Sequence, residues 1–108
     1  MSIFCKRLKD ARKAAGISQE RLGILAGIEP ASASARMNQY ETGKHAPNTS
    51  TVSLMAGVLN VPPSYFYSED DEEARLLLLF HRMDSTRRMQ ILELGAQLAE
   101  ASPRPPGR

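Results

Sequence analysis

Two short helical segments, each followed by a glycine, lie within residues 17–44 and constrain the fold of this chain more than any other feature. Ser18 is a typical N-cap for the first segment, and Gly27 lies where a left-handed residue ends many helices. The second segment spans residues 31–42 and is followed by Gly43. The pattern therefore predicts two helices, each with a glycine stop, joined by a turn.

Apolar residues recur at helical spacing within both segments, and this spacing predicts the faces that they bury. The residues expected to face the core are Leu22, Leu25 and Ala26 in the first segment and Ala33, Met37 and Tyr40 in the second. Glu29-Pro30 signals a turn or a helix start, because proline is favoured at the first helical position. Two short helices joined by a turn form a helix-turn-helix, whose second helix can enter the major groove of DNA.

The sequence on both sides of this segment predicts further helices. Upstream, one face of a helix ending at Gly16 is formed by Phe4, Leu8, Ala11 and Ala15. Downstream, Thr49 or Ser50 can cap a fourth helix, and residues 64–67 predict one further turn, with Tyr65 and Phe66 at the edge of the core. The apolar positions of the fourth helix are Val52, Met55, Ala56 and Leu59. Residues 70–83 and 84–99 each begin with acidic or capping residues and predict two more helices, so the fold class is all-α.

The charge of the chain is unevenly distributed. Its 108 residues carry a net charge of only +2. Residues 1–67 contain eight Lys or Arg and four acids, which gives 8 − 4 = +4, whereas residues 68–108 contain six Arg and eight acids, which gives 6 − 8 = −2. A surface that binds phosphate is therefore expected in the first part of the chain.

Several classes of protein are not favoured by this sequence. No apolar run approaches the roughly 20 residues of a membrane span, and charges throughout residues 1–13 argue against a signal peptide. Cys5 is the only cysteine, and His45 and His81 lie far apart. We therefore expect a cytoplasmic protein without a membrane segment, with no catalytic residues, no metal site and no cofactor.

Four groups of residues resemble the Cro/lambda-repressor family of helix-turn-helix proteins, also called XRE-like. These are Gly16-Ile17-Ser18-Gln19-Glu20-Arg21-Leu22, Leu25-Ala26-Gly27, Tyr40-Glu41-Thr42-Gly43-Lys44 and Leu59-Asn60-Val61-Pro62. The resemblance covers about residues 3–67 and implies a five-helix lambda-repressor-like DNA-binding domain over residues 1–67, usually acting as a dimer on paired half-sites. Residues 68–100 are similar to a two-helix C-terminal extension that some members carry, and residues 101–108 are expected to be a disordered tail.

The chain departs from the family pattern between Gly27 and Glu41. This interval is longer than the usual spacing by about one helical turn. The additional residues fall within residues 28–32, where they either lengthen the turn or extend the start of the third helix.

The outward face of the third helix carries the residues expected to read DNA bases. With Ala33, Met37 and Tyr40 facing inward, a rotation of about 100° per residue turns a different set toward solvent. The candidate base-reading residues are Ser34, Ala35, Arg36, Asn38 and Gln39. Asn and Gln can bind adenine, Arg can bind guanine, and Ala can contact a thymine methyl group. Arg36 could equally contact a phosphate, and outside this motif Asn38 and Gln39 would fit an ordinary solvated face.

Phosphate contacts are expected from residues at the borders of the helices. The candidates are Gln19, Ser32, Thr42 and Lys44. Gln19 matches a backbone-contacting position of the family, and Lys44 is the best cationic candidate because it follows the glycine stop. The resemblance also implies a structural ion pair between Arg12 and Glu41, which connects the first and third helices.

Two functions remain open at this point. In the first, the chain is a sequence-specific transcriptional regulator, most simply a repressor that binds an inverted repeat in double-stranded DNA as a homodimer through residues 70–100. The extension is the expected dimer contact because its leucines exceed what two helices can hide from water. In the second, the same apolar surface holds a partner protein, as in an antitoxin or an adaptor with autoregulatory DNA binding.

Overall fold

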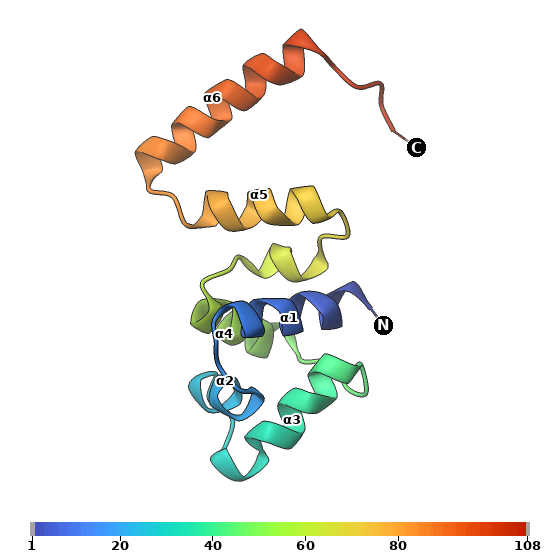
Figure 1. Ribbon diagram of the computed structural model, residues 1–108, viewed down its shortest axis with the longest axis vertical. Helices are drawn as coiled ribbons and strands as arrows, with labels where there is room; N and C mark the ends of the chain where they lie inside the picture. Colours follow the sequence, from blue (N-terminus) through green and yellow to red (C-terminus); the bar gives the residue numbers. More distant parts are fainter. Residues whose placement is uncertain (1, 108) are drawn as a thin grey trace.

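The computed structural model describes residues 2–107, and every regular element within them is a helix (Figure 1). The elements are α1 (Ile3–Ala14), α2 (Gln19–Leu25), α3 (Pro30–Thr42), α4 (Thr49–Leu59), the 3-10 helix η1 (Pro63–Tyr67), α5 (Asp71–His81) and α6 (Ser85–Ala101). The predicted all-α class is confirmed. The short fifth helix expected over residues 64–67 is the 3-10 helix η1.

Local capping signals account for most of the helix ends. Ser18 Oγ accepts a hydrogen bond of 3.0 Å from the backbone N–H of Arg21 at the start of α2. Gly43 adopts a φ of 83°, in the left-handed region that an L side chain disfavours, and so ends α3. The prediction for α4 was wrong by one position: its N-cap is Asn48, whose Oδ1 accepts from the N–H of Thr51 at 2.8 Å.

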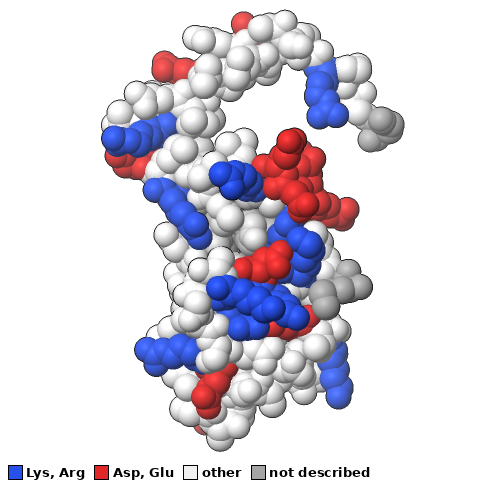
Figure 2. All heavy atoms as spheres, in the orientation of Figure 1, with Lys and Arg blue, Asp and Glu red and all other residues white. Residues whose placement is uncertain are grey.

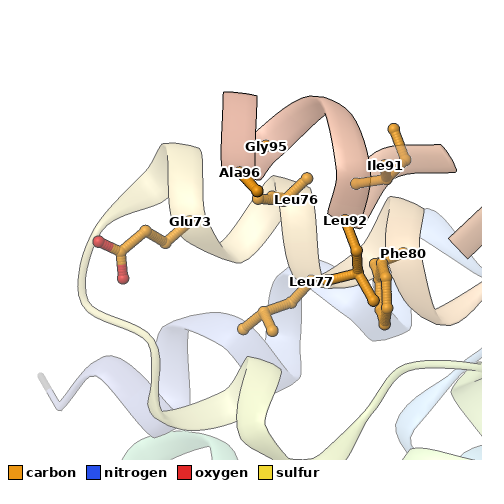
Figure 3. A pocket seen from close by; sticks show the side chains of 8 residues that line it. All are labelled: Glu73, Leu76, Leu77, Phe80, Ile91, Leu92, Gly95 and Ala96. Carbon is orange, nitrogen blue, oxygen red and sulfur yellow. The ribbon is translucent and has the colours of Figure 1, made fainter. Parts of the chain in front are cut away.

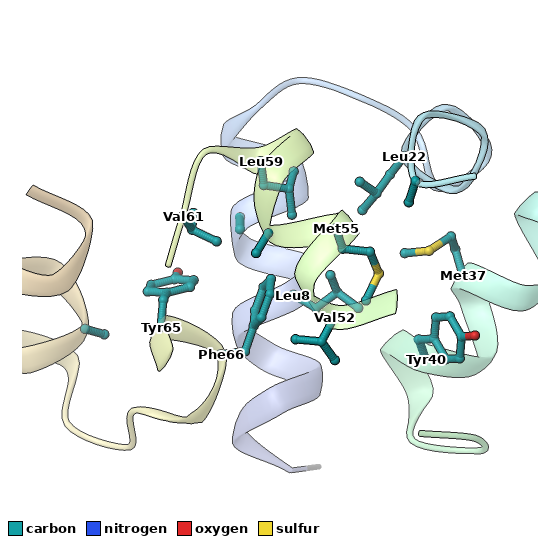
Figure 4. Close-up of a cluster of buried hydrophobic side chains, with 14 residues drawn as sticks. Leu8, Leu22, Met37, Tyr40, Val52, Met55, Leu59, Val61, Tyr65 and Phe66 are labelled. Carbon is teal, nitrogen blue, oxygen red and sulfur yellow. The ribbon is translucent and has the colours of Figure 1, made fainter. Parts of the chain in front are cut away.

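The hydrophobic core lies where the first five elements meet (Figure 4). Each of these elements supplies one of the largest fully buried side chains, which are Leu8, Leu22, Met37, Met55 and Phe66. Phe66 is completely buried, so its predicted place at the edge of the core was wrong. Leu25 and Ala15 were also expected to face inward, yet Leu25 is 46% exposed and Ala15 is exposed as well. The buried faces of α1 and α2 are therefore narrower than the spacing of apolar residues in the sequence suggested.

The turn between α2 and α3 is short, and the additional residues of this chain extend α3. Helix α2 ends at Leu25 and α3 begins at Pro30, which takes the favoured position in the first turn. Helix α3 is 13 residues long, against seven for α2. Of the two arrangements that the sequence allowed, the structure shows the longer helix.

Helices α5 and α6 relate differently to this core. Ala74 of α5 is 2% exposed and Leu78 packs against the core cluster, so α5 covers the end of the core at η1 (Figure 1). Helix α6 has no buried residue and extends beyond α5 at the far end of the molecule (Figure 1). No helix within residues 2–107 is both long enough and apolar enough to cross a membrane.

Candidate nucleic-acid interface

Helix α3 turns one face to the core and the other to solvent. Ala33 and Met37 are completely buried, and Tyr40 is 6% exposed. The five predicted base-reading positions are the exposed Ser34, Ala35, Arg36 and Asn38 and the half-buried Gln39. All five therefore lie on the accessible side of one helix. Except for Arg36, they are uncharged and either small or amide-bearing.

These five positions do not lie in a single row along α3. At about 100° per residue, Ala35 and Gln39 occupy the middle of the exposed face, and Asn38 lies on the border toward α2. Arg36 lies on the opposite border, toward α4. There it lines a hollow together with Ser32 of α3 and with Thr51 and Leu54 of α4.

A polar network beneath this surface connects α1, α2 and α3. Arg12 Nε and Nη2 donate to the two carboxylate oxygens of Glu41 at 2.5 and 3.2 Å, and Arg12 Nη1 donates to the carbonyl of Ile17 at 2.9 Å. The Glu41 side chain is only 3% exposed, so this bidentate pair compensates a charge that would otherwise be buried alone. The structure thus brings together the two residues that the family resemblance implied.

Gln19 extends this network to the reading surface. Its Nε2 donates to Glu41 Oε1 at 3.1 Å and to Asn38 Oδ1 at 3.4 Å. The side chain of Asn38 is therefore held by a residue of α2, and that residue is held by the ion pair. A preordered amide loses less side-chain entropy when it binds a base edge.

The other predicted phosphate contacts lie at the two ends of α3. Ser32 is half-buried near its start, and Thr42 and Lys44 are exposed at its end. Thr42 Oγ1 donates to the carbonyl of Gln39 at 3.4 Å. Gln19 is the first residue of α2, and its side chain lies between α2 and α3, where the amide nitrogen donates to Asn38 and Glu41.

Gly23 is a contact residue that the sequence analysis did not single out. A Cβ atom placed on Gly23 would lie 2.9 Å from the Cβ of Ala33 and 3.1 Å from the Cγ of Met37. Such contacts are too short, so α2 and α3 can approach this closely only with glycine at this position. Gly23 has no left-handed φ, and for this reason no local pattern indicated its role.

The distribution of charge places basic residues on the first part of the fold. Figure 2 shows Lys and Arg gathered over α1, whereas Asp and Glu gather around the start of α5. Within residues 2–107, no group of three or more His, Cys, Asp or Glu side chains is arranged to hold a metal ion. The candidate site therefore consists of an exposed polar helix on a domain with excess positive charge.

Comparison with known proteins decides the family. The model of a helix-turn-helix family matches residues 8–66, which is more than half of the chain. The chain belongs to the Cro/C1-type helix-turn-helix family. This helix-turn-helix protein is also similar to a solved structure described as the transcriptional regulator BswR, with 42% identity and a TM-score of 0.84 over 94% of this chain and 98% of that one. No curated protein matches the chain.

Membership of this family indicates what the protein does. Members of this helix-turn-helix family are DNA-binding transcriptional regulators and not enzymes, and the similarity to BswR extends through α5 and α6 because it covers nearly the whole chain. The protein is therefore a DNA-binding transcriptional regulator. Helix α3 is the second helix of the motif, the one that enters the major groove in this class of protein.

Proposed function

We propose that this regulator is a repressor that binds an inverted repeat in double-stranded DNA as a homodimer. The observation that carries the proposal is the contrast between the two exposed surfaces of the chain. The free face of α3 is polar and suits base edges, whereas the free face of α6 is rich in leucine and suits another protein surface.

In this proposal the middle of α3 reads the bases. Gln39 and Asn38 bind adenine through their amides, and Ala35 contacts a thymine methyl group. Arg36 and Ser34 lie on either side of this row, within reach of bases at its margins. Lys44, Thr42 and Ser32 contact the phosphates and fix the register of the helix in the groove. Gln19, whose amide nitrogen already donates to Glu41 and Asn38, supports Asn38 from beneath instead.

The dimer contact is assigned to residues 70–100, where α5 and α6 form an apolar groove of about 520 Å³ (Figure 3). Apart from Glu73 at one end, it is lined by Leu76, Leu77, Phe80, Ile91, Leu92, Gly95 and Ala96. Leu94 and Leu98 of α6 do not line the groove and are 50% and 61% exposed. Apolar surface of this extent costs free energy while it remains in water.

A second copy of the chain is the occupant that this surface fits best. The extension carries both an apolar groove and a ridge of exposed leucines. Two copies related by a two-fold axis can therefore each place the ridge in the groove of the other. Such a dimer matches the two-fold symmetry of an inverted repeat. Of the residues that line the groove only Glu73 is charged, so apolar contacts dominate the surface that the two copies would share.

Binding to DNA is tested by selecting sequences from a random duplex library and measuring affinity by fluorescence anisotropy at several salt concentrations. We expect an inverted repeat to be selected, and affinity to fall steeply with salt because counterions are released. Gln39→Ala should weaken binding by about 1–3 kcal/mol per half-site and relax the preference at one base pair. Gln97→Ala is the matched control, because Gln97 is an exposed glutamine on α6.

Dimerisation is tested by light scattering and sedimentation. The double variant Leu94→Lys/Leu98→Lys should be monomeric, whereas Gln97→Lys adds a charge to the same helix and should remain dimeric. A chain ending at Met83 keeps α5, which packs on the core, and should fold as a monomer with weaker DNA binding. If the wild type is monomeric and α6 instead captures a partner protein, the homodimer proposal fails and the antitoxin or adaptor alternative takes its place.

A further inference from the structure

Three arginines connect different helices by donating to backbone carbonyls at helix ends. Arg7 of α1 is 4% exposed, and its Nε donates to the carbonyl of Ser68 at 2.9 Å, just after η1. Arg82 Nε donates to the carbonyl of Asn60 at 3.0 Å, at the end of α4. Arg88 Nε and Nη2 donate to the carbonyls of Phe80 and His81, both at 3.0 Å, at the end of α5.

These carbonyls lie at or just beyond helix ends, where the i+4 N–H partner of the helix interior is missing. The Phe80 carbonyl also accepts from the N–H of Met83 at 3.2 Å. Two further contacts fix the positions of the guanidinium groups. Arg7 Nη2 forms an ion pair of 3.0 Å with Asp71 in the first turn of α5, and the guanidinium carbon of Arg88 lies 4.9 Å from the centre of the Phe80 ring. Helix α5 is therefore attached to the domain at both ends, by Arg7 and Arg82, and between them through the buried Ala74 and the partly buried Leu78.

Helix α6 has a different attachment. It has no buried residue, so little of its position is fixed by core packing. Its N-terminus follows a short turn, where Asp84 accepts from the N–H of Arg87 at 2.9 Å. Arg88 is the residue of α6 whose guanidinium group donates to the last carbonyls of α5.

We propose that Arg88, together with Arg82 and Arg7, forms a rigid connection between the recognition helix and the dimer contact, and so sets the half-site spacing that the dimer accepts. The inference rests on the proposed function, because it requires α6 to hold two copies together on an inverted repeat. Changing the spacing by one base pair moves a half-site by about 3.4 Å and rotates it by about 35°. A rigid dimer cannot follow such a change, whereas a flexible one can.

The test measures affinity for a series of duplexes in which the selected half-sites are separated by one base pair fewer, by the selected number, and by one or two more. The wild type should discriminate against altered spacing by about tenfold or more. Arg88→Ala should keep its affinity for the selected spacing within about threefold and reduce the discrimination to about threefold or less. Arg82→Ala should act in the same direction, through the junction of α4 and α5.

Arg87→Ala is the matched control. It removes the same charge from the neighbouring residue, but Arg87 is exposed and forms its ion pair with Asp84 at the start of its own helix. This variant should discriminate as the wild type does. Undiminished discrimination in both Arg88→Ala and Arg82→Ala would overturn the inference, as would a wild type that binds an inverted repeat but accepts every spacing equally.

A second measurement makes the inference independent of DNA. Spin labels at Glu20→Cys in α2 and Gln97→Cys in α6, in a Cys5→Ala background and diluted with unlabelled chains, report the distance between the two regions of one chain. The distribution should be narrow in the otherwise wild-type chain and in Arg87→Ala, and broad in Arg88→Ala. An equally narrow distribution in Arg88→Ala refutes the connection. Failure to bind any inverted repeat, with the broadening observed, refutes the proposed function instead.

Discussion

Helices α3 and α6 have opposite relations to the rest of the protein. Helix α3 buries four of its 13 residues, whereas none of the 17 residues of α6 is buried. The exposed residues also differ. Those of α3 are mainly polar or small, and those of α6 include Met89, Leu92, Leu94 and Leu98, each at least half exposed.

The difference in burial between α3 and α6 suits them to different partners, DNA bases for α3 and an apolar protein surface for α6. A helix whose position is fixed by buried contacts can present hydrogen-bonding groups in a constant geometry, which base recognition requires. Leucines that a helix leaves in water favour association, because the free energy of the system falls when another apolar surface covers them. Stability measurements at a protein concentration at which light scattering finds a monomer should therefore show large effects of substitutions around α3 and small effects in α6.

The largest contrast is expected between two ion pairs. Arg12→Ala leaves the 3% exposed Glu41 without its partner and should lower the free energy of unfolding by about 4 kcal/mol. Arg87→Ala breaks an exposed pair with Asp84 and should change it by about 0.5 kcal/mol or less. Urea denaturation followed by circular dichroism measures both. Equal losses in the two variants would show that burial does not distinguish the pairs.

Two methionines provide the next contrast. Met37 is completely buried in α3, and Met37→Ala should cost about 3 kcal/mol through lost contacts and the cavity that remains. Met89 is 62% exposed in α6, and Met89→Ala should alter stability by about 0.5 kcal/mol or less. Thermal unfolding at matched low concentrations compares them. A loss above about 1.5 kcal/mol for Met89→Ala would mean that α6 is packed even in the monomer.

Features that depend on a few neighbouring residues were predictable from the sequence. The Ser18 cap, the stop at Gly43 and the buried set around Met37 follow from local pattern, and the structure shows all three. Leu25 was assigned to the core because its spacing is helical. It is exposed because a helix of seven residues has only two turns, whose buried face is already filled by Leu22 and the close contact at Gly23.

Contacts between residues that are far apart in the sequence were not predictable from local pattern. Arg7, Arg82 and Arg88 donate to backbone carbonyls, and a carbonyl acceptor is present at every residue, so it leaves no mark in the sequence. The Arg12–Glu41 pair was foreseen only through the family resemblance, since 28 other residues lie between the partners. The accessible side of α3 could be placed by periodicity. Which of its residues contact bases remains a prediction.

Two glycines extend the comparison to a smaller effect. Gly23→Ala forces apart α2 and α3, where the added Cβ would lie 2.9 Å from Ala33, and should cost about 1–3 kcal/mol. Gly95 of α6 has no atom within 4 Å of an added Cβ, so Gly95→Ala should stabilise the monomer by about 0.5–1 kcal/mol through higher helix propensity. Denaturant midpoints of the two variants should therefore move in opposite directions. A shift in the same direction would contradict the difference in packing.

The smallest expected effect concerns Tyr65, in η1, where the core meets α5. Burial raises the pKa of Tyr65 above its ordinary value of 10.0, and this outweighs the opposing effect of the Arg7 charge. Because the unfolded chain ionises first, the stability contributed by neutral Tyr65 is fully present below pH 10.0 and is lost as pH rises through the folded-state pKa. Tyr65→Phe should therefore flatten the decline in stability at alkaline pH. Tyr67 is exposed, so Tyr67→Phe controls for the loss of a hydroxyl group. An unchanged slope in Tyr65→Phe would show that the packing around Tyr65 is lost before its side chain ionises.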